Sequence, residues 1–279
     1  MRAPPCLAAA LGAFALAGSL LPVAPAAADE PAPAATASPS STTPASWCAP
    51  ELEALPNDIC AFVPPKDGAR TLIIFLHGVI QPDTTWQWAQ QRAASRAAAR
   101  HGFTLIAPRG RRGIGPKSME DWWTWPTAAA AQKTHEDALI TEWNAARAEL
   151  EKRAGKPFDR VFLFGFSNGA YYAASLAVRD RIQVDGYAVF AGGSGAKHLK
   201  QAGARTTRRA PIYVGWGDRD GARRDQEKLG QMLRELGWPS KARGRKGVGH
   251  AMTDVQVDEA VAFLSATKIA SSTGRPSKP

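Results

Sequence analysis

The sequence predicts an α/β fold in which a mostly parallel central sheet is covered by helices on both faces. Short apolar runs alternate with longer segments of helical period between residues 71 and 264, which is the pattern of such a sheet. The chain has 279 residues, of which 44% are hydrophobic and 22% charged, enough to bury a large core. No internal repeat or second linker interrupts residues 47–267, so we expect a single domain there.

The first 28 residues have the form of a secretory signal peptide. Arg2 is followed by an apolar run from Leu7 to Leu21 and by small residues that end at Ala28. A membrane anchor is the alternative, but the run is short, broken by Pro22 and without a basic flank. We therefore expect a secreted or periplasmic protein with no stable membrane insertion after signal removal.

Two further segments are predicted to lack fixed structure. Residues 29–46 are nearly all Pro, Ala, Ser and Thr, and residues 268–279 have a similar character. Such compositions bury too little apolar surface to offset the entropy of the chain. We expect a disordered linker and a flexible tail around the domain.

The elements of the domain can be assigned in chain order from apolar runs and helical periodicity. The strands are expected at Thr71–Leu76, Phe103–Ala107, Arg160–Phe164, Gly186–Phe190 and Pro211–Val214, with a sixth, less apolar one at Lys241–Lys246. The helices are expected at Thr85–Arg100, Thr134–Arg153, Asn168–Ala177, Ala222–Leu236 and Asp254–Leu264. The last two carry apolar stripes at i, i+3, i+4 and i+7, which indicate faces that pack on the sheet.

The cysteines indicate a disulfide. Cys6 would leave with the signal peptide, and Cys48 and Cys60 would remain in an oxidising compartment. We expect these two to be bonded to each other, the alternative being two buried thiols. No further cysteine is left for a thiolate metal site or a nucleophile.

The formal net charge of +10 makes the chain strongly basic. The Lys and Arg residues are spread over several segments, and no zinc-finger, helix-turn-helix or RNP signature accompanies them. We therefore expect no nucleic-acid partner. Attraction to anionic polymers or envelope surfaces is compatible with the charge.

A G-x-S-x-G motif at Gly165–Gly169 places Ser167 between an apolar strand and a helix rich in small residues. This order holds a serine in a sharp turn with its hydroxyl exposed above the sheet, while the two glycines allow backbone to approach closely. The helix N-terminus adds a favourable dipole for a developing oxyanion. Ser167 is thus the candidate nucleophile, the alternative being a serine in an ordinary glycine turn.

An activated serine needs a base, and triads of this kind follow the chain order Ser, acid, His. His250 meets that order and lies in a glycine-bearing loop before the last amphipathic helix. The acid is expected after the strand at Pro211–Val214, where Asp218 and Asp220 both occur. We predict Asp218 because it is closer to the strand end, and we interpret Asp220 as a helix cap or as the alternative acid.

Backbone amides are the expected oxyanion donors. His77 and Gly78 end the first strand, where this fold places a loop that donates an N–H group. The predicted donors are the amides of Val79 and Asn168. His77 itself is interpreted as a structural residue of that loop.

Aromatic residues are concentrated in two segments that start from the predicted active-site edge. They could wall a substrate pocket for an acyl chain, an aryl group or a sugar ring, or several of them could be core. No long insertion follows Phe190, so we expect an open cleft with no large lid domain. The candidate pocket residues are Trp86, Trp88, Trp122, Trp123 and Trp125.

With these motifs in place, the chain resembles the α/β-hydrolase superfamily from about Thr71 to Leu264. Within it, the segment Gly165–Gly169 is similar to the secreted esterases of the polyhydroxyalkanoate depolymerase and feruloyl esterase type, and more loosely to dienelactone hydrolases and carboxylesterases. The residues after Asp218 and Gly169 depart from the pattern of those esterases. The resemblance implies the α/β-hydrolase fold and a serine carboxylic ester hydrolase.

The expected reaction is hydrolysis of a small or polymer-borne carboxylic ester through an acyl-enzyme, with no cofactor and no metal. A peptidase or amidase on the same fold is one alternative, and a non-catalytic polymer-binding protein is another. The complete set of Ser, Asp and His favours an enzyme.

Overall fold

A computed structural model describes residues 46–65 and 70–271 of the chain. The predicted signal peptide, residues 29–45 of the predicted linker and residues 272–279 of the predicted tail lie outside the described residues.

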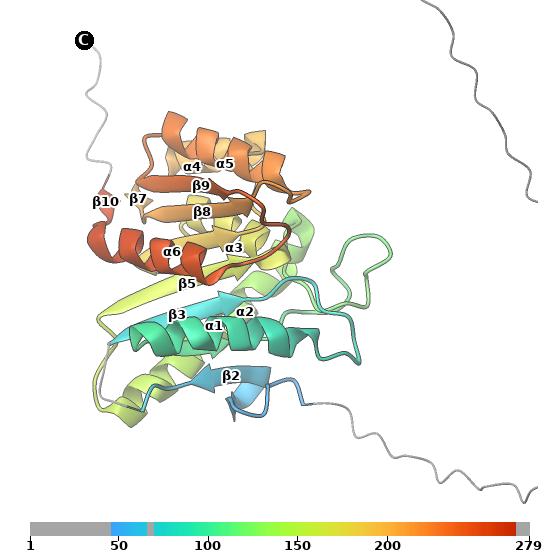
Figure 1. The fold of residues 1–279 in the computed structure, drawn as a ribbon, viewed down its shortest axis with the longest axis vertical. Helices are drawn as coiled ribbons and strands as arrows, with labels where there is room; N and C mark the ends of the chain where they lie inside the picture. The colour runs from blue at the N-terminus through green and yellow to red at the C-terminus, as the bar shows by residue number, and fades with distance from the viewer. Residues whose placement is uncertain (1–45, 66–69, 272–279) are drawn as a thin grey trace, which may run out of the picture. The chain divides into compact units, whose positions relative to one another are not determined.

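Eight strands form one mixed, mostly parallel sheet in the order β1-β2-β4-β3-β5-β6-β8-β9 (Figure 1). The two strands at one end, β1 and β2, are antiparallel to their neighbours, and the remaining pairs are parallel. The strands are β1 (Glu53–Leu55), β2 (Ile59–Phe62), β3 (Thr71–Leu76), β4 (Thr104–Ala107), β5 (Arg160–Phe166), β6 (Gly186–Phe190), β8 (Ile212–Gly217) and β9 (Ser240–Arg245). The parallel arrangement brings the ends of β3, β5 and β8 to one edge, where loops carry functional side chains.

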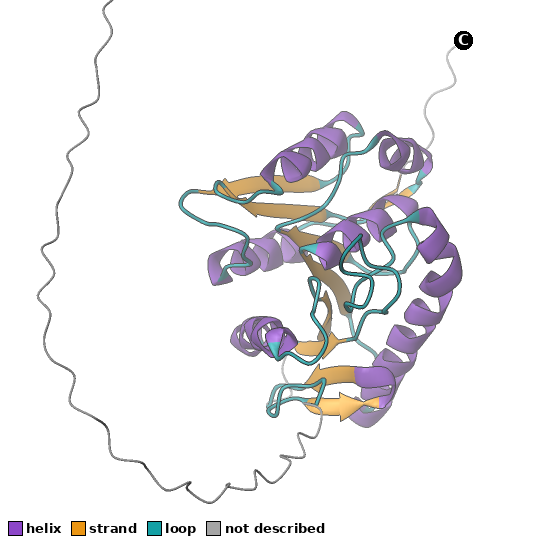
Figure 2. Cartoon of the chain, turned by 90° about the vertical axis from the view of Figure 1, so that its right-hand side faces the viewer, coloured by secondary structure: helices purple, strands orange, loops and turns teal. Residues whose placement is uncertain are grey.

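Helices cover both faces of the sheet (Figures 1 and 2). One buried cluster joins the sheet to α2, α3, α4 and α5, and a second joins it to α1 and α6. The helices are α1 (Trp86–His101), α2 (Ala129–Ala154), α3 (Asn168–Arg179), α4 (Lys197–Arg205), α5 (Arg223–Glu235) and α6 (Asp254–Ala266). The apolar stripes predicted from the sequence are buried at Leu229 and Leu233 of α5 and at Val257 and Val261 of α6.

The N-terminal part of the domain is held by a cysteine pair. Cys48 and Cys60 are bonded, with their Cα atoms 5.3 Å apart, and both are buried. Cys60 lies on β2, which pairs with β4. The link therefore attaches the segment before β1 to the second strand of the sheet, and it joins the two cysteines expected to pair.

The predicted fold class is confirmed: the sheet is mostly parallel, helices lie on both faces, and no large lid is evident among residues 46–65 and 70–271. Strands β3 and β6 have the predicted bounds. The sequence analysis missed β1, β2, α4, a single 3-10 turn (Pro56–Asp58), and a two-stranded sheet of β7 (Arg208–Arg209) and β10 (Ala270–Ser271). Strand β10 extends regular structure beyond residue 267, where the flexible tail was expected to begin.

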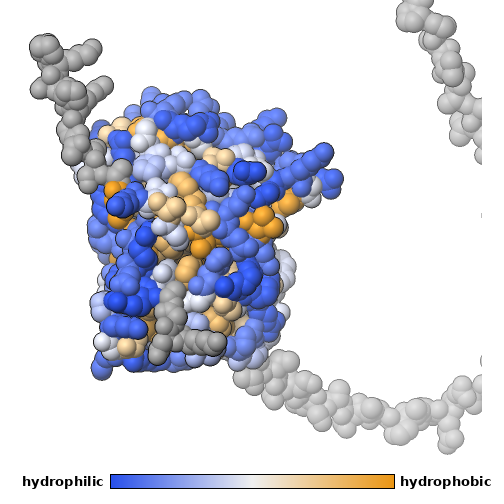
Figure 3. Space-filling model, turned by 60° about the vertical axis from the view of Figure 1, so that its left-hand side comes forward, coloured by the Kyte–Doolittle hydropathy of each residue, from blue (hydrophilic) through white to orange (hydrophobic). Residues whose placement is uncertain are grey.

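Hydrophilic side chains cover most of the face in Figure 3, and apolar colour is confined to limited patches. In the part of the chain that the structure describes, no helix has the length and apolarity that crossing a membrane requires. Among residues 46–65 and 70–271, three large apolar side chains are well exposed: Val63, Trp86 and Val255.

Candidate active site

Ser167 lies in the turn between β5 and α3 with a strained backbone. Its φ and ψ angles are 52° and −117°, a conformation that non-glycine residues rarely adopt. A Cβ atom on Gly169 would lie 2.2 Å from the carbonyl oxygen of Leu76, and one on Gly165 would lie 2.4 Å from that of Gly169. Because these neighbours are backbone atoms, only glycine fits at either position, as the G-x-S-x-G motif indicates.

His250 lies in the loop between β9 and α6 and reaches the serine. Its Nε2 atom is 2.8 Å from Oγ of Ser167, and its ring packs against Phe166 with 5.2 Å between the ring centroids. The side chain is 47% exposed, so substrate and water have access to it. The structure thus brings together two residues that are 83 positions apart in the sequence.

The carboxylate next to His250 belongs to Asp220. Its Oδ1 atom is 2.9 Å from Nδ1 of His250 and also accepts a hydrogen bond from the backbone N–H of Ala222, at 2.9 Å. The Asp220 side chain is 1% exposed, and no described residue is a hydrogen-bond partner of its Oδ2 atom. This carboxylate is therefore desolvated and directed at the imidazole.

The prediction that Asp218 orients His250 is wrong in this structure. Strand β8 continues to Gly217 instead of ending at Val214, so the loop begins later than expected. The backbone of Asp218 still continues the pairing of β8 with β9, because its N–H donates to the carbonyl of Arg245 at the end of β9. Its side chain is exposed. The acid thus comes two residues later in the loop.

Asp218 has a different contact: its Oδ1 atom accepts the backbone N–H of Gly247 at 2.7 Å. The N–H of Arg219 donates to the carbonyl of Val248 in the same loop, at 3.0 Å. A Cβ atom on Gly217 would lie 2.1 Å from that carbonyl oxygen, so the two loops approach as closely as backbone allows. Asp218 therefore helps to tie the loop that carries Asp220 to the loop that carries His250.

Two backbone amides next to the serine have no acceptor. Among the residues that the structure describes, none accepts the N–H of Val79 or of Asn168. Asn168 is the first residue of α3, whose first N–H groups have no intrahelical partner. Gly78 lies against Ser167, since a Cβ atom on it would lie 3.1 Å from the serine Cβ. Asn168 thus follows the nucleophile directly, and Val79 follows a glycine that lies against it.

His77 is buried and shapes this region, as its structural interpretation predicted. Its Nδ1 contacts the carbonyl oxygen of Gly78, and its Nε2 accepts the N–H of Gly110 at 3.0 Å, which requires a neutral ring. Burial lowers the pKa of His77 to about 4, so the ring is neutral at pH 7. Its carbonyl accepts the N–H of Gly169 and the indole N–H of Trp125.

This geometry agrees with what comparison with known proteins finds. Residues 57–268 match the phospholipase/carboxylesterase family. The chain belongs to this family. The predicted α/β-hydrolase superfamily and the class of serine carboxylic ester hydrolase are thereby confirmed.

Solved structures share the fold of this family member at low sequence identity. The crystal structure of esterase PE8 is 19% identical, with a TM-score of 0.54 over 77% of this chain and 98% of that one. Zea mays acyl-protein thioesterase 2 is 16% identical, with a TM-score of 0.52 over 75% and 97%. A protein described as YahD with malic acid is 17% identical, with a TM-score of 0.52 over 76% and 99%. No curated protein gives a significant sequence match.

The five predicted pocket tryptophans of this carboxylesterase family member have different environments. Trp125 is fully buried, stacks on Tyr172 and donates its indole N–H to the carbonyl of His77. Trp88 lies against the N-terminal segment and donates to the carbonyl of Ser46. Trp86 and Trp122 pack edge to face, with centroids 5.7 Å apart. Of the five, only Trp123 lines the cavity beside the loop that follows β3.

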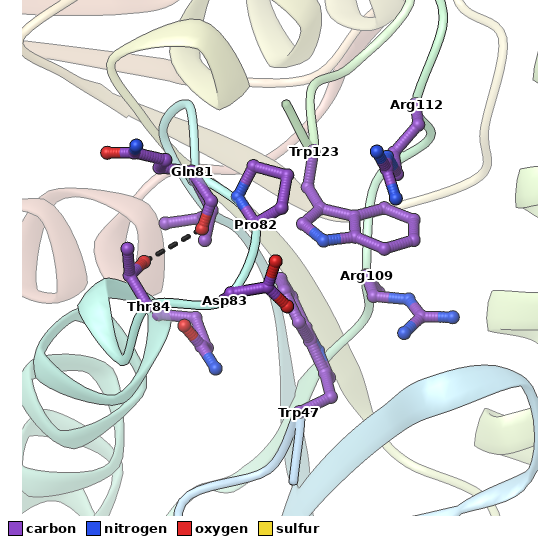
Figure 4. A pocket seen from close by; sticks show the side chains of 10 residues that line it. Trp47, Gln81, Pro82, Asp83, Thr84, Arg109, Arg112 and Trp123 are labelled. Carbon is purple, nitrogen blue, oxygen red and sulfur yellow. Dashed lines mark hydrogen bonds between the residues drawn. The ribbon is translucent and has the colours of Figure 1, made fainter. Parts of the chain in front are cut away.

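A cavity of about 180 Å³ lies beside the loop that follows β3 (Figure 4). The backbone of Ile80 pairs with that of Trp123 by two hydrogen bonds. These bonds connect residues 78–80, which carry the predicted oxyanion donor and are called the oxyanion segment, to the cavity wall. The sequence analysis missed Trp47, which reaches the cavity from the segment attached by the disulfide. The cavity is lined by Trp47, Ile80, Gln81, Pro82, Asp83, Thr84, Gln87, Arg109, Arg112 and Trp123.

Over residues 46–65 and 70–271, no three His, Cys, Asp or Glu side chains are grouped as the ligands of a metal ion would be. Ser167, His250 and Asp220 form a hydrogen-bonded series at the site, and Asp83, Arg109 and Arg112 line the neighbouring cavity.

Proposed function

We propose that this protein hydrolyses carboxylic esters through an acyl-enzyme formed on Ser167. The observation that carries the proposal is the hydrogen-bonded chain from Ser167 through His250 to the buried carboxylate of Asp220. Nucleophile, base and orienting acid at these separations are the arrangement that acyl transfer by serine requires. Membership of the phospholipase/carboxylesterase family supports an ester as the substrate.

In the first half of the reaction, Ser167 Oγ attacks the ester carbonyl while its proton passes to Nε2 of His250. The negative charge that develops on the carbonyl oxygen is stabilised by the free amides of Val79 and Asn168. Each such donor contributes roughly 3 to 4 kcal/mol to transition-state stabilisation. The tetrahedral intermediate then collapses, the C–O bond to the alcohol breaks, and the imidazolium gives its proton to the leaving oxygen.

In the second half, water attacks the acyl carbonyl and His250 takes a proton from it. The C–O bond to Ser167 then breaks, the imidazolium returns the proton to Oγ, and the carboxylic acid leaves. Asp220 has the same role in both halves. It accepts the Nδ1 proton, which fixes the tautomer with a free Nε2, and its charge stabilises the imidazolium. The strained backbone at Ser167 holds Oγ in the same place throughout.

The test is the Ser167→Ala variant, assayed on p-nitrophenyl acetate and with a fluorophosphonate probe. Ester turnover should fall by several orders of magnitude and labelling should be lost, while the melting temperature stays near that of the wild type. Ser265→Ala, an exposed position on α6, is the matched control and should label normally. Labelling of Ser167→Ala at another residue would overturn the assignment of the nucleophile.

The same assays separate the alternatives. Comparable rates on a p-nitroanilide would favour a peptidase or amidase, since the fold alone does not fix the substrate. A wild-type protein that binds polymers but neither reacts with the probe nor cleaves any ester would be a non-catalytic binder.

We also propose that the protein works after export. The pairing of Cys48 with Cys60 supports this, because disulfides persist in oxidising compartments. Mass spectrometry of the exported protein should find an N-terminus at residue 29 and no thiol that alkylates without reduction. Two free thiols in the exported protein would contradict the proposal.

A further inference from the structure

The cavity beside the oxyanion segment has polar groups without protein partners. Gln87 is 3% exposed, and its Oε1 atom has no hydrogen-bond partner among the described residues. The indole Nε1 of Trp47 is buried and likewise lacks an acceptor in the described part of the chain. Both residues line the cavity. Because buried polar groups are nearly always paired in native proteins, these two indicate a missing partner.

The other wall residues show what kind of partner fits. Figure 4 shows Asp83 directed between Trp47 and Trp123, and the guanidinium groups of Arg109 and Arg112 on either side of the Trp123 indole. The distances from these guanidinium carbons to the Trp123 ring centroid are 4.1 Å and 5.7 Å.

Arg109 is paired with Asp58, and Arg112 forms a longer ion pair with Asp121, with 3.7 Å between Nη2 and Oδ1. The buried Gln87 amide and Trp47 indole N–H, together with the exposed carboxylate of Asp83 and the exposed guanidinium of Arg112, offer donors and acceptors in several directions.

An acyl chain does not suit this wall, because it would leave the buried Gln87 Oε1 and Trp47 Nε1 unpaired. A simple anion does not suit it either, because an anion only accepts hydrogen bonds, while Gln87 Oε1 needs a donor and the Asp83 carboxylate repels negative charge. A hydroxyl group both donates and accepts, so several hydroxyls on one ring would satisfy all of these groups. Indole edges and faces also favour the C–H surface of such a ring.

The place of the cavity relates it to the reaction. Gly78 lies against Ser167, and Ile80, two residues later, is part of the cavity wall. Two residues span at most about 7 Å. A ring in the cavity would therefore lie within one substrate length of the nucleophile. The volume of about 180 Å³ is below the range typical of drug-sized ligands, so it holds one ring and not a stretch of polymer.

We propose that this cavity binds a pyranose ring, so that the substrate is an ester carried on a carbohydrate. This inference rests on the proposed ester hydrolysis for its substrate, but the binding site stands on the cavity alone. In it, Trp47 Nε1 and Arg112 donate to ring oxygens, while Asp83 and Gln87 accept from hydroxyls.

The binding test uses the Ser167→Ala variant of the full chain, so that no turnover interferes. Methyl glucoside, methyl xyloside and octanoate are titrated separately while the indole N–H signals are followed by NMR. A pyranoside should shift the signal of Trp47, assigned with Trp47→Phe, and leave that of the core residue Trp143 in place. No shift of Trp47 with either pyranoside, or a shift with octanoate alone, would overturn the proposal.

The activity test compares an acetylated methyl pyranoside with p-nitrophenyl acetate in the same variant. Gln87→Met removes the amide at similar volume, so the ratio of kcat/KM for the sugar ester to that for the aryl ester should fall about tenfold. Gln231→Met, on the exposed face of α5, is the control and should leave the ratio unchanged. A Gln87→Met variant with an unchanged ratio would refute the role of Gln87 in sugar recognition.

The two proposals fail in different ways. If the ester mechanism is wrong, Ser167→Ala keeps its turnover while the pyranoside still shifts Trp47. If the sugar site is wrong, the wild type cleaves p-nitrophenyl acetate but no pyranoside shifts Trp47.

Discussion

Replacing Asp220 by Asn tests which aspartate orients the base. In the structure, Asp220 Oδ1 accepts two N–H groups, from His250 and Ala222, while Oδ2 has no described partner. If the Asn oxygen keeps both bonds, its NH₂ group is buried at the position of Oδ2 without an acceptor. If the amide flips, its NH₂ group faces two other donors. Neither orientation supplies the negative charge that stabilises the imidazolium.

The magnitude follows from the burial of this carboxylate. The Asp220 side chain is 1% exposed and lies 2.9 Å from the imidazole, so solvent screens the interaction little. Loss of the corresponding charge in serine triads costs about 10³- to 10⁴-fold in kcat. This is about 4 to 5.5 kcal/mol of transition-state stabilisation. We expect Asp220→Asn to lose this much transition-state stabilisation, while its free energy of unfolding changes by much less.

Asp218→Asn is the matched control, two residues away in the same loop. Asp218 is exposed, and its side chain accepts a hydrogen bond from the N–H of Gly247, which an Asn oxygen can also accept. Its kcat/KM should stay within a small factor of the wild-type value. The assay is kcat/KM on p-nitrophenyl acetate from pH 6 to 9, with thermal unfolding measured alongside. If Asp218→Asn is the crippled variant and Asp220→Asn stays active, the reasoning from the hydrogen bonds is refuted.

Three further predictions concern the scaffold around the site. Gly169→Ala should destabilise the fold by about 3 kcal/mol or more, since its Cβ would meet two carbonyl oxygens. Gly221→Ala is the control: a Cβ there has open space around it, so this variant should unfold near the wild-type temperature. Similar melting temperatures for both variants would count against the turn geometry. The low pKa of His77 means that the unfolded chain binds a proton that the native state excludes, so the free energy of unfolding should fall by about 3 kcal/mol as the pH drops from about 6.5 to about 4. NMR should show no titration of His77 between pH 8 and 5, and a midpoint near 6.5 would contradict its burial. Cys48 and Cys60 are 12 residues apart, so reduction of their bond should lower the free energy of unfolding by about 2 to 3 kcal/mol in urea titrations. An unchanged urea midpoint of unfolding would show that the bond does not stabilise the domain.

The sequence predicted those parts of the molecule that depend on local pattern. Strands β3 and β6 are short apolar runs buried on both faces, and their bounds were predicted to the residue. Ser167 could be recognised because the turn between β5 and α3 requires glycine on both sides. His250 followed from chain order and from the glycine-bearing loop around it.

The parts that were missed depend on pairing across the fold. Gly215, Trp216 and Gly217 have the composition of a loop, yet they remain in β8 because β9 pairs with them residue by residue. That pairing moved the loop and made Asp220 the partner of His250. Strands β1 and β2 are likewise defined by pairing with each other and with distant β4, which local propensity does not encode.

The pairing between Ile80 and Trp123 has a consequence for how this scaffold can change. Both of its hydrogen bonds join main-chain groups only, so they hold the oxyanion segment to the cavity wall whatever side chains are present. Residues such as Gln81, Arg112 or Trp123 could therefore be exchanged to admit other ligands while the amide of Val79 keeps its position. Selection for a new substrate could act on the cavity without first having to rebuild the chemistry beside it.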